Sequence, residues 1–461
     1  MLSCLRSDAP DDAVAILPLT RSALEKWVVQ APPEQAAWVN SMGFTASPGT
    51  TVLLPNADGK VARVLAGVGD RIDLWSLAGL PLGLPKGVYR VEGVEDAATA
   101  TAVAIGWALG SYQFTRYKRP MKEPSVLVLP DAADKAAVER VATTAYMVRD
   151  LVNTPAEHMG PPDLALAAEQ LAAEFGAQVQ VTVGDDLLTA SYPMVHAVGR
   201  ASVRAPRLID ITWGDATNPL VVLVGKGVCF DSGGLDIKPS SGMLLMKKDM
   251  GGAAHALGLA RMVMMAELPV RLRVLVPAVE NAISGNAFRP MDILPTRKGL
   301  TVEIGNTDAE GRLILCDALA EGDAAKPALM VDFATLTGAA RVALGPDLPA
   351  LFSNDDALAE QVLAAARATD DPLWRLPLWQ GYRPQLDSKI ADLNNAPGGG
   401  MAGAITAALF LEQFVSRTTP WVHLDLYAWN QGNRPGRPEG GEAMTLRALF
   451  AVLEKRFGSA A

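Results

Sequence analysis

The stretch Pro219-Leu-Val-Val-Leu-Val224 is an uninterrupted apolar run rich in valine. Such a run is typical of a strand that is buried on both faces of a parallel sheet. Similar runs at Leu208–Trp213, Leu272–Pro277, Leu329–Phe333 and Trp421–Leu426 alternate with helix-like segments. This alternation predicts an α/β fold class, with a mainly parallel central sheet that helices cover on both faces.

The first 130 residues carry shorter apolar runs separated by turns, and a helix is expected near Ala97–Leu109. The runs lie at Ala13–Leu19, Thr51–Leu54, Val61–Leu65 and Ser125–Leu129. We therefore predict a small N-terminal α/β domain over residues 1–130. A charged, helix-prone segment over residues 131–152 is expected to connect it to a larger C-terminal domain over residues 153–461.

The composition is ordinary for a globular protein of two or three domains, with 461 residues, 49% of them apolar and 20% charged. A net charge of −9 provides no broad basic surface for nucleic acid. No apolar segment is long enough to predict a membrane span, and the acidic N-terminus does not resemble a signal peptide. Cys4, Cys229 and Cys316 are too few and too scattered for a disulfide framework. We expect a cytoplasmic protein.

Reactive side chains follow the quoted strand directly. Lys226 and Asp231 stand among four glycines between residues 225 and 234, and Lys238 comes next. Asp249 stands where a further helix is expected to begin. Taken singly, each has an ordinary explanation, Asp249 as a helix N-cap and the lysines as loop or surface residues. The order of these residues along the chain is more informative than any one of them.

A second group lies in Asn306–Leu313, where Asp308, Glu310 and Arg312 are spaced two residues apart. In an extended segment, residues i and i+2 point to the same side, so both carboxylates can reach the same metal ion or pair of ions. Helical periodicity begins near Gly311, which places Arg312 in a first helical turn. The free N–H groups there and the guanidinium favour a bound anion.

Together these segments resemble the leucyl aminopeptidase family, also called the M17 cytosol aminopeptidases, which are dinuclear metallopeptidases. The resemblance covers about residues 150–440 and rests on several segments in the family's order. They are Asn153-Thr154-Pro155, Gly225–Gly234, Ile237-Lys238-Pro239, Met246–Ala254, Asn306–Leu313 and Asp332–Ala339.

The resemblance implies an aminopeptidase that removes leucine-type and related N-terminal residues from peptides. It implies two divalent metal ions (Mn or Zn, with Mg or Co as alternatives), a hydroxide shared by them, and bicarbonate as general base. The implied metal ligands are Lys226, Asp231, Asp249, Asp308 and Glu310. Lys238 and Arg312 are the implied catalytic residues, and Gly311, Arg312 and Leu313 would bind bicarbonate. The implied substrate-binding residues are Met246, Thr335, Leu336, Gly338 and Tyr427.

The histidines agree with a site built from carboxylates. The chain has four, at positions 158, 196, 255 and 423, and none shows the His-x-x-x-His spacing of the commonest zinc proteases. His255 lies in an alanine-rich helical segment and is expected to be a core residue. Hard oxygen ligands make such a site permissive among divalent ions.

Tyr427 departs from the family's usual pattern, because a small residue normally lines the pocket for the first side chain at that position. If Tyr427 lines the pocket here, Tyr427→Ala should favour Leu and Phe substrates relative to Ala. Packing of the ring into the core is the alternative.

The family also implies a homo-hexamer acting on peptides with a free N-terminus. Two other functions stay open, a two-metal phosphoesterase and a non-catalytic scaffold or DNA-binding protein. The basic cluster of Arg116, Lys118, Arg119 and Lys122 is the only feature that points to DNA, and a solvated surface explains it equally well.

Overall fold

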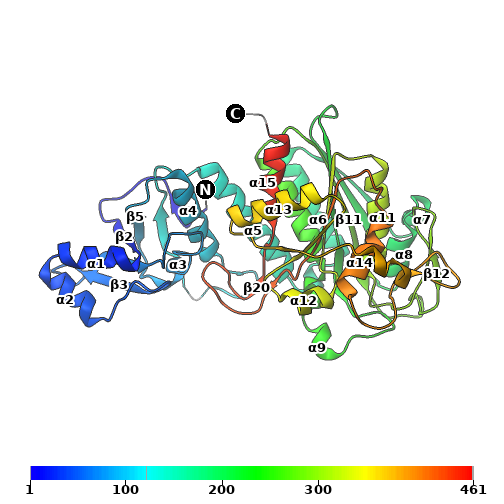
Figure 1. Ribbon diagram of the computed structural model, residues 1–461, viewed down its shortest axis with the longest axis horizontal. Helices are drawn as coiled ribbons and strands as arrows, with labels where there is room; N and C mark the ends of the chain where they lie inside the picture. Colours follow the sequence, from blue (N-terminus) through cyan, green and yellow to red (C-terminus); the bar gives the residue numbers. More distant parts are fainter. Residues whose placement is uncertain (1, 121, 459–461) are drawn as a thin grey trace. The chain divides into compact units, whose positions relative to one another are not determined.

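The computed structural model describes residues 2–120 and 122–458, and these form two compact units (Figure 1). Unit 1 holds the chain up to Tyr146 together with Asn430–Glu439. Unit 2 holds Met147–Trp429 and the chain from Gly440 onward. The predicted division at residues 130 and 153 did not include the return of Asn430–Glu439 to the N-terminal unit.

Unit 1 is an α/β unit around a six-stranded sheet of order β1-β6-β5-β2-β4-β3. Its neighbours are parallel except for β3 and β4. The strands are β1 (Leu5–Arg6), β2 (Val14–Leu19), β3 (Thr51–Pro55), β4 (Val61–Gly67), β5 (Val88–Val91) and β6 (Val126–Val128). The helices are α1 (Arg21–Gln30), α2 (Pro33–Ser41), α3 (Leu80–Gly83) and α4 (Ala97–Ser111). Helix α5 (Lys135–Asn153) continues into unit 2.

Unit 2 is built on a nine-stranded sheet of order β16-β15-β18-β14-β9-β11-β8-β7, with β10 paired to β11. Its strands are β7 (Gln178–Val183), β8 (Arg207–Trp213), β9 (Leu220–Gly225), β10 (Gly227–Asp231), β11 (Arg271–Asn281), β14 (Leu329–Ala334), β15 (Ala350–Ser353), β16 (Trp374–Arg375) and β18 (Trp421–Asp425). The central strands β18, β14, β9 and β11 are parallel, as predicted, while β7, β8 and β15 add antiparallel pairings.

A second sheet of unit 2 contains β12 (Ile293–Pro295), β13 (Thr301–Glu303) and β17 (Leu393–Asn394). The helices of this unit are α6 (Pro161–Phe175), α7 (Asp186–Thr189), α8 (Pro193–Gly199), α9 (Ser240–Met243), α10 (Gly251–Met265), α11 (Gly311–Ala324), α12 (Gly338–Leu344), α13 (Asp356–Ala368), α14 (Gly403–Glu412) and α15 (Leu446–Phe457). Three 3₁₀ turns and two short strands complete the chain: η1 (Ala156–His158), η2 (Met246–Met250), η3 (Gln380–Leu386), β19 (Trp429–Asn430) and β20 (Gly440–Gly441). In the described part of the chain, no helix is both long and apolar enough to cross a membrane.

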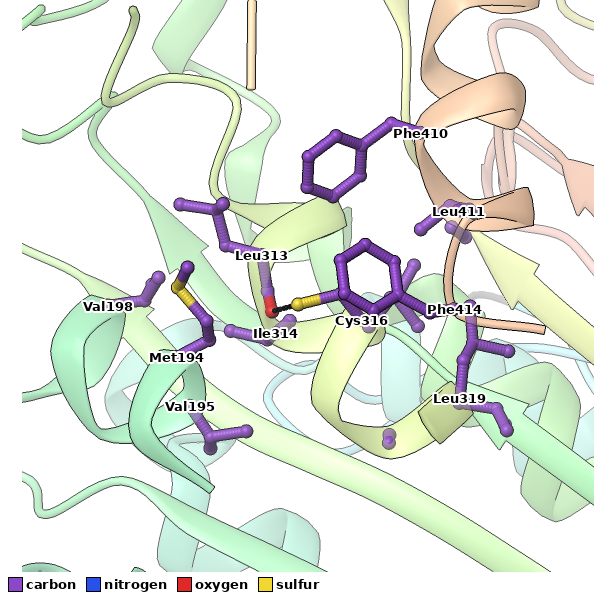
Figure 2. Close-up of a cluster of buried hydrophobic side chains, with 14 of the residues drawn as sticks. Met194, Val195, Val198, Leu313, Ile314, Cys316, Leu319, Phe410, Leu411 and Phe414 are labelled. Carbon is purple, nitrogen blue, oxygen red and sulfur yellow. Dashed lines mark hydrogen bonds between the residues drawn. The ribbon is translucent and has the colours of Figure 1, made fainter. Parts of the chain in front are cut away.

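Two groups of helices pack on the large sheet. Helices α6, α10, α13 and α15 are linked by mutual contacts, as are α8, α11 and α14. One helix of each group, α10 and α11, packs on β9 and β14. Figure 2 shows the second group, in which Leu313, Ile314 and Leu319 of α11 lie among side chains from α8 and α14. This apolar packing fixes the helix whose first turn carries part of the predicted site.

A break in one strand places the first reactive lysine. Strands β9 and β10 both pair with β11 in parallel, and Lys226 lies between them. The backbone N–H of Lys226 donates to Phe333 O (2.9 Å), and its carbonyl accepts from Ala253 N (2.8 Å). Both polar groups of the break are therefore satisfied by β14 and α10. Strand β9, which the apolar run predicts, thus ends directly before Lys226, the first predicted metal ligand.

Candidate active site

The predicted site residues gather at one edge of the large sheet. Asp231 ends β10, Thr335 and Leu336 follow β14, and Tyr427 follows β18. Parallel strands bring their carboxyl ends to the same edge, which is where open α/β sheets bind ligands. The η2 turn and the loop before α11 add the remaining residues, including Asp249 and Glu310.

A cavity of about 440 Å³ lies at this edge. Its lining includes every predicted metal ligand, the predicted catalytic lysine Lys238 and every predicted substrate-binding residue. These are Lys226, Asp231, Lys238, Met246, Asp249, Asp308, Glu310, Thr335, Leu336, Gly338 and Tyr427. The predicted bicarbonate residues Gly311, Arg312 and Leu313 are not part of this lining.

Three carboxylates form the centre of the site. Asp231, Asp308 and Glu310 each offer an oxygen, and these oxygens lie within 4.8 Å of one another. Lys238 Nζ lies 2.8 Å from Asp231 Oδ2 and 2.5 Å from Asp308 Oδ1. Lys226 Nζ lies 3.0 Å from Glu310 Oε1. The two ammonium groups thus partly balance acids that would otherwise repel one another.

Asp249 joins this cluster through Lys226, whose Nζ lies 2.8 Å from Asp249 Oδ2 and donates to Thr335 O at 3.1 Å. The Thr335 hydroxyl in turn donates to Asp249 Oδ1 at 2.8 Å. Asp249 does not cap α10, because the N-cap position belongs to Met250 and has no side-chain cap bond. The N-cap explanation of Asp249 was therefore wrong.

Crowding and burial shift the pKa values of these groups. Burial, followed by the nearby Asp231, raises the pKa of Glu310 to about 8 and that of Asp308 to about 6. Burial also raises the pKa of Asp249. Burial opposes the charge on Lys226, but the carboxylates around it raise the pKa of this amine above its ordinary value. A bound cation would reduce the electrostatic repulsion among these carboxylates.

Polar contacts aim the carboxylates into the cavity. Asp231 Oδ1 accepts from Asn281 Nδ2 (2.9 Å) and from the backbone N–H of Gly233 (2.8 Å). Glu310 Oε2 is buried and has no hydrogen-bond partner within the described ranges 2–120 and 122–458. A buried carboxylate oxygen without a donor is costly unless a ligand or ion completes it. Asn281 was not singled out from the sequence, because an asparagine after a strand is an ordinary turn signal.

Arg312 lies in the first turn of α11 and is buried. Its Nη1 donates to Asn395 O at 2.5 Å, while Nε has no hydrogen-bond partner among the residues described. Burial lowers the pKa of this guanidinium to about 10, so it is charged at neutral pH. The N–H of Leu313 already donates to Glu310 O at 3.0 Å.

Asn395 is a second residue that the sequence did not reveal. Its Oδ1 accepts from the backbone N–H groups of Gly305 and Asn306, and its Nδ2 donates to Asn306 O at 2.8 Å. Asn395 thereby holds the backbone just before the predicted metal ligands Asp308 and Glu310. Its own carbonyl accepts the hydrogen bond from Arg312. Its partners lie almost ninety positions away along the chain, so no local spacing announces it.

Gly311 is required by close packing. A Cβ at this position would lie 2.5 Å from Lys226 Cε. A side chain at position 311 would therefore push the lysine away from Glu310 and Asp249.

Tyr427 lines the cavity together with residues predicted to line the side-chain pocket. Met246, Thr335 and Gly338 line the same cavity. Lys248 Nζ lies 4.3 Å from the centroid of the Tyr427 ring, and Arg341 Cζ lies 5.3 Å from it. Burial lowers the pKa of Lys248 to about 8. Neither cation was singled out from the sequence.

Comparison with known proteins decides the family. The family model "Cytosol aminopeptidase family, catalytic domain" matches residues 146–450, and "M17 aminopeptidase, N-terminal domain" matches residues 14–130. The chain belongs to the cytosol aminopeptidase family. The resemblance seen in the sequence is confirmed, and with it the α/β fold class. The protein is a peptidase and thus a hydrolase.

Three relatives show how far the similarity extends. The crystal structure of the cytosol aminopeptidase from Coxiella burnetii is 51% identical, with a TM-score of 0.96 over 99% of this chain and 100% of that chain. The bottromycin maturation enzyme BotP, solved in complex with Mn, is 35% identical, with a TM-score of 0.86 over 96% of this chain and 99% of that chain. The probable cytosol aminopeptidase of Roseiflexus castenholzii is 42% identical over 372 residues, which cover 77% of this chain and 76% of that protein.

Proposed function

We propose that the protein is a two-metal aminopeptidase that removes leucine-type and related residues from the N-termini of peptides. The observation that carries this proposal is the cluster of Asp231, Asp308 and Glu310 oxygens in the cavity at the carboxyl edge of the sheet. Family membership supports aminopeptidase activity.

The residues present fit a pair of divalent ions. The donors are hard carboxylate oxygens plus one amine, and the buried Glu310 Oε2 has no donor among the residues described. We infer that one ion is held by Asp231, Asp308 and Glu310, and the other by Asp231, Glu310, Asp249 and Lys226. Hard carboxylate ligands make the site permissive among Mn, Zn, Mg and Co, the family resemblance favours Mn or Zn, and BotP is a relative solved with Mn.

Such ions supply Lewis acidity and lower the pKa of water. The protein's own groups then act on the substrate. Lys238 Nζ sits between Asp231 and Asp308 at the cavity wall, where its ammonium would stabilise negative charge that develops on the scissile carbonyl oxygen. An ion held by these carboxylates would supply a binding site for the free α-amine of the substrate, which restricts cleavage to N-termini.

We infer that Arg312 binds bicarbonate and that bicarbonate acts as general base. The buried Nε without a partner among the described residues and the position at a helix N-terminus both favour a small anion. The N–H groups of Gly311 and Arg312 lie in the same turn, whereas that of Leu313 is already used by Glu310. In this role Arg312 positions the base that accepts the proton from water.

The function is tested with leucine p-nitroanilide and its N-acetylated form. Activity should disappear after chelation and return with Mn, Zn or Co, and the acetylated substrate should not be cleaved. p-Nitrophenyl phosphate serves as the comparison substrate for a phosphoesterase. Full peptidase activity in protein shown by elemental analysis to be free of metal would contradict the proposal, as would metal-dependent turnover of the phosphate ester alone.

We also infer a homo-hexamer in the cytoplasm, as in the family. Large apolar side chains exposed on unit 2, among them Val342, Trp374 and Trp379, are suited to burial against further copies. Light scattering of the purified protein should give six chain masses, and a monomer at micromolar concentration would contradict this assembly.

A further inference from the structure

The wall of the cavity carries a buried lysine that the proposed mechanism does not use. Lys248 lies in η2 between Met246 and Asp249, and only 5% of its surface is exposed. Its Nζ lies over the Tyr427 ring, 4.3 Å from the centroid. The lysine also belongs to the lining of the cavity. A buried ammonium on a cavity wall is costly to retain unless something offsets its desolvation.

A second cation flanks the same ring. Arg341 projects from α12, and its Cζ lies 5.3 Å from the Tyr427 centroid. Over residues 2–120 and 122–458, neither Lys248 nor Arg341 forms an ion pair with a carboxylate, and a tyrosine face is the contact that both share. Lys226 and Lys238, by contrast, each contact two carboxylates. The cavity thus carries two cations around Tyr427 that form no ion pair with a carboxylate among the described residues.

The carboxylate of Asp425 also lines the cavity, but its oxygens are already engaged. Oδ1 accepts from Leu336 N (3.0 Å) and Thr337 N (3.2 Å), and Oδ2 accepts from the Thr337 hydroxyl (2.6 Å). This acid therefore stabilises the turn after β14. It leaves the two cations available to an acidic group on a ligand.

We propose that this part of the cavity selects an N-terminal residue with an acidic side chain, glutamate or aspartate, over the corresponding amide. The proposal rests on the aminopeptidase function proposed above and adds a substrate class to it. A carboxylate side chain would pair with Lys248 and Arg341 over the Tyr427 ring. An amide of the same size would leave both cations without a counter-charge, which is the kind of mismatch that discriminates strongly in buried sites.

The test compares kcat/KM for glutamyl and glutaminyl p-nitroanilides, with leucyl p-nitroanilide as reference. Wild-type protein should prefer glutamyl to glutaminyl substrate. Lys248→Met should lower the glutamyl-to-glutaminyl ratio by about tenfold or more, as expected for loss of one charge-assisted contact. Arg341→Gln should lower the ratio in the same direction, and by less because Arg341 is exposed to solvent.

Lys247→Met is the matched control. Lys247 is the adjacent lysine, but its Nζ donates to Asn153 O (2.6 Å), and it is not part of the cavity lining. The control removes one positive charge from the same turn and should leave the glutamyl-to-glutaminyl ratio unchanged. An equal drop in both lysine variants would show a general field effect and overturn the proposed contact.

Binding gives a readout that does not depend on turnover. L-Glutamate should raise the melting temperature of the metal-loaded wild-type protein more than L-glutamine does, and Lys248→Met should remove the difference. If leucyl and glutaminyl substrates are cleaved at least as well as glutamyl substrate, and glutamate binds no better than glutamine, the acidic preference is wrong while the aminopeptidase stands. If no substrate is cleaved by metal-loaded protein but glutamate still binds selectively, the failure lies in the proposed function instead.

Discussion

Lys226 and Lys238 present the same ammonium group to one cluster of acids, but their surroundings differ. The Lys226 side chain is 3% exposed and is held by Asp249, Glu310 and the carbonyl of Thr335. The Lys238 side chain is 15% exposed, and its Nζ forms ion pairs with Asp231 and Asp308. An ammonium has no lone pair for a metal, so the enclosed lysine would hold an ion only as the neutral amine, while the more open lysine is placed to meet a substrate.

We predict that Lys238→Ala lowers kcat by about a hundredfold or more and leaves the metal content intact, which is the usual loss for one oxyanion donor. Metal content is measured by elemental analysis on the same samples as kcat. Lys298→Ala is a suitable control, since that lysine bonds to Gln413 O, away from the cavity. A Lys238→Ala protein that has lost its ions would refute the separate roles of the two lysines.

The gathering of charged residues from short motifs could be predicted from the sequence, as Asp308 and Glu310 show. When the other motifs are considered as well, the two-residue spacing of these residues has few explanations other than a shared site. Asn281 and Asn395 could not, because their roles depend on partners that lie far away in the sequence. Lys248 could not be predicted either, because the Tyr427 ring that it contacts follows β18, far away in the sequence.

At the scale of elements, helix α10 shows how a buried polar residue is accommodated. His255 is fully buried, its Nδ1 lies 2.6 Å from Gly251 O, and its Nε2 accepts from Met444 N at 2.9 Å. These contacts fit only the neutral ring with hydrogen on Nδ1. Burial accordingly lowers the pKa of His255 to about 4. The expectation that His255 is a core residue is confirmed.

A pH dependence of stability follows from this shift. The unfolded chain binds a proton to His255 near pH 6.5, while the folded chain resists it down to about 4. The contribution is therefore complete above pH 6.5 and is lost as the pH falls toward 4. Denaturant unfolding should show a loss of about 3 kcal/mol over this range that is absent in His255→Gln, measured with chelator present.

The control is His158→Gln, which makes the same substitution at an exposed histidine. Parallel profiles for wild type and His255→Gln would mean that the ring is protonated in the folded protein.

Strand prediction succeeded where a run of apolar residues has no competing explanation. The predicted strands near Leu220, Leu272, Leu329 and Trp421 correspond to β9, β11, β14 and β18. Strand β10 was not predicted, because its residues Gly227–Asp231 combine a glycine start with a charged end. It forms because it continues β9 along β11 across the break at Lys226, and only the tertiary pairing supplies that support.

At the scale of the whole molecule, the chain leaves unit 2 after Trp429 and contributes Asn430–Glu439 to unit 1. Arg437 Cζ of this segment lies 4.1 Å from the centroid of the Trp75 ring. This segment of ten residues, with two glycines, two prolines and two arginines, has no periodicity from which such a return can be predicted. The family models, which match residues 14–130 and 146–450, place the main division close to that of the compact units.

The acid cluster links the stability of unit 2 to metal. A ligand that binds only the folded state adds about 2.7 kcal/mol at a hundredfold excess over its dissociation constant. Titrating Mn into chelated protein should therefore raise the melting temperature steeply, because every proposed ligand lies in unit 2. Asp249→Ala should lose much of the rise, since it removes a ligand of one ion, while Lys238→Ala should keep it. Asp387→Ala, which alters only an exposed pair with Arg383, is the control. An equal rise in all three variants would mean that Mn binds elsewhere, and the assignment of Asp249 as a ligand would be wrong.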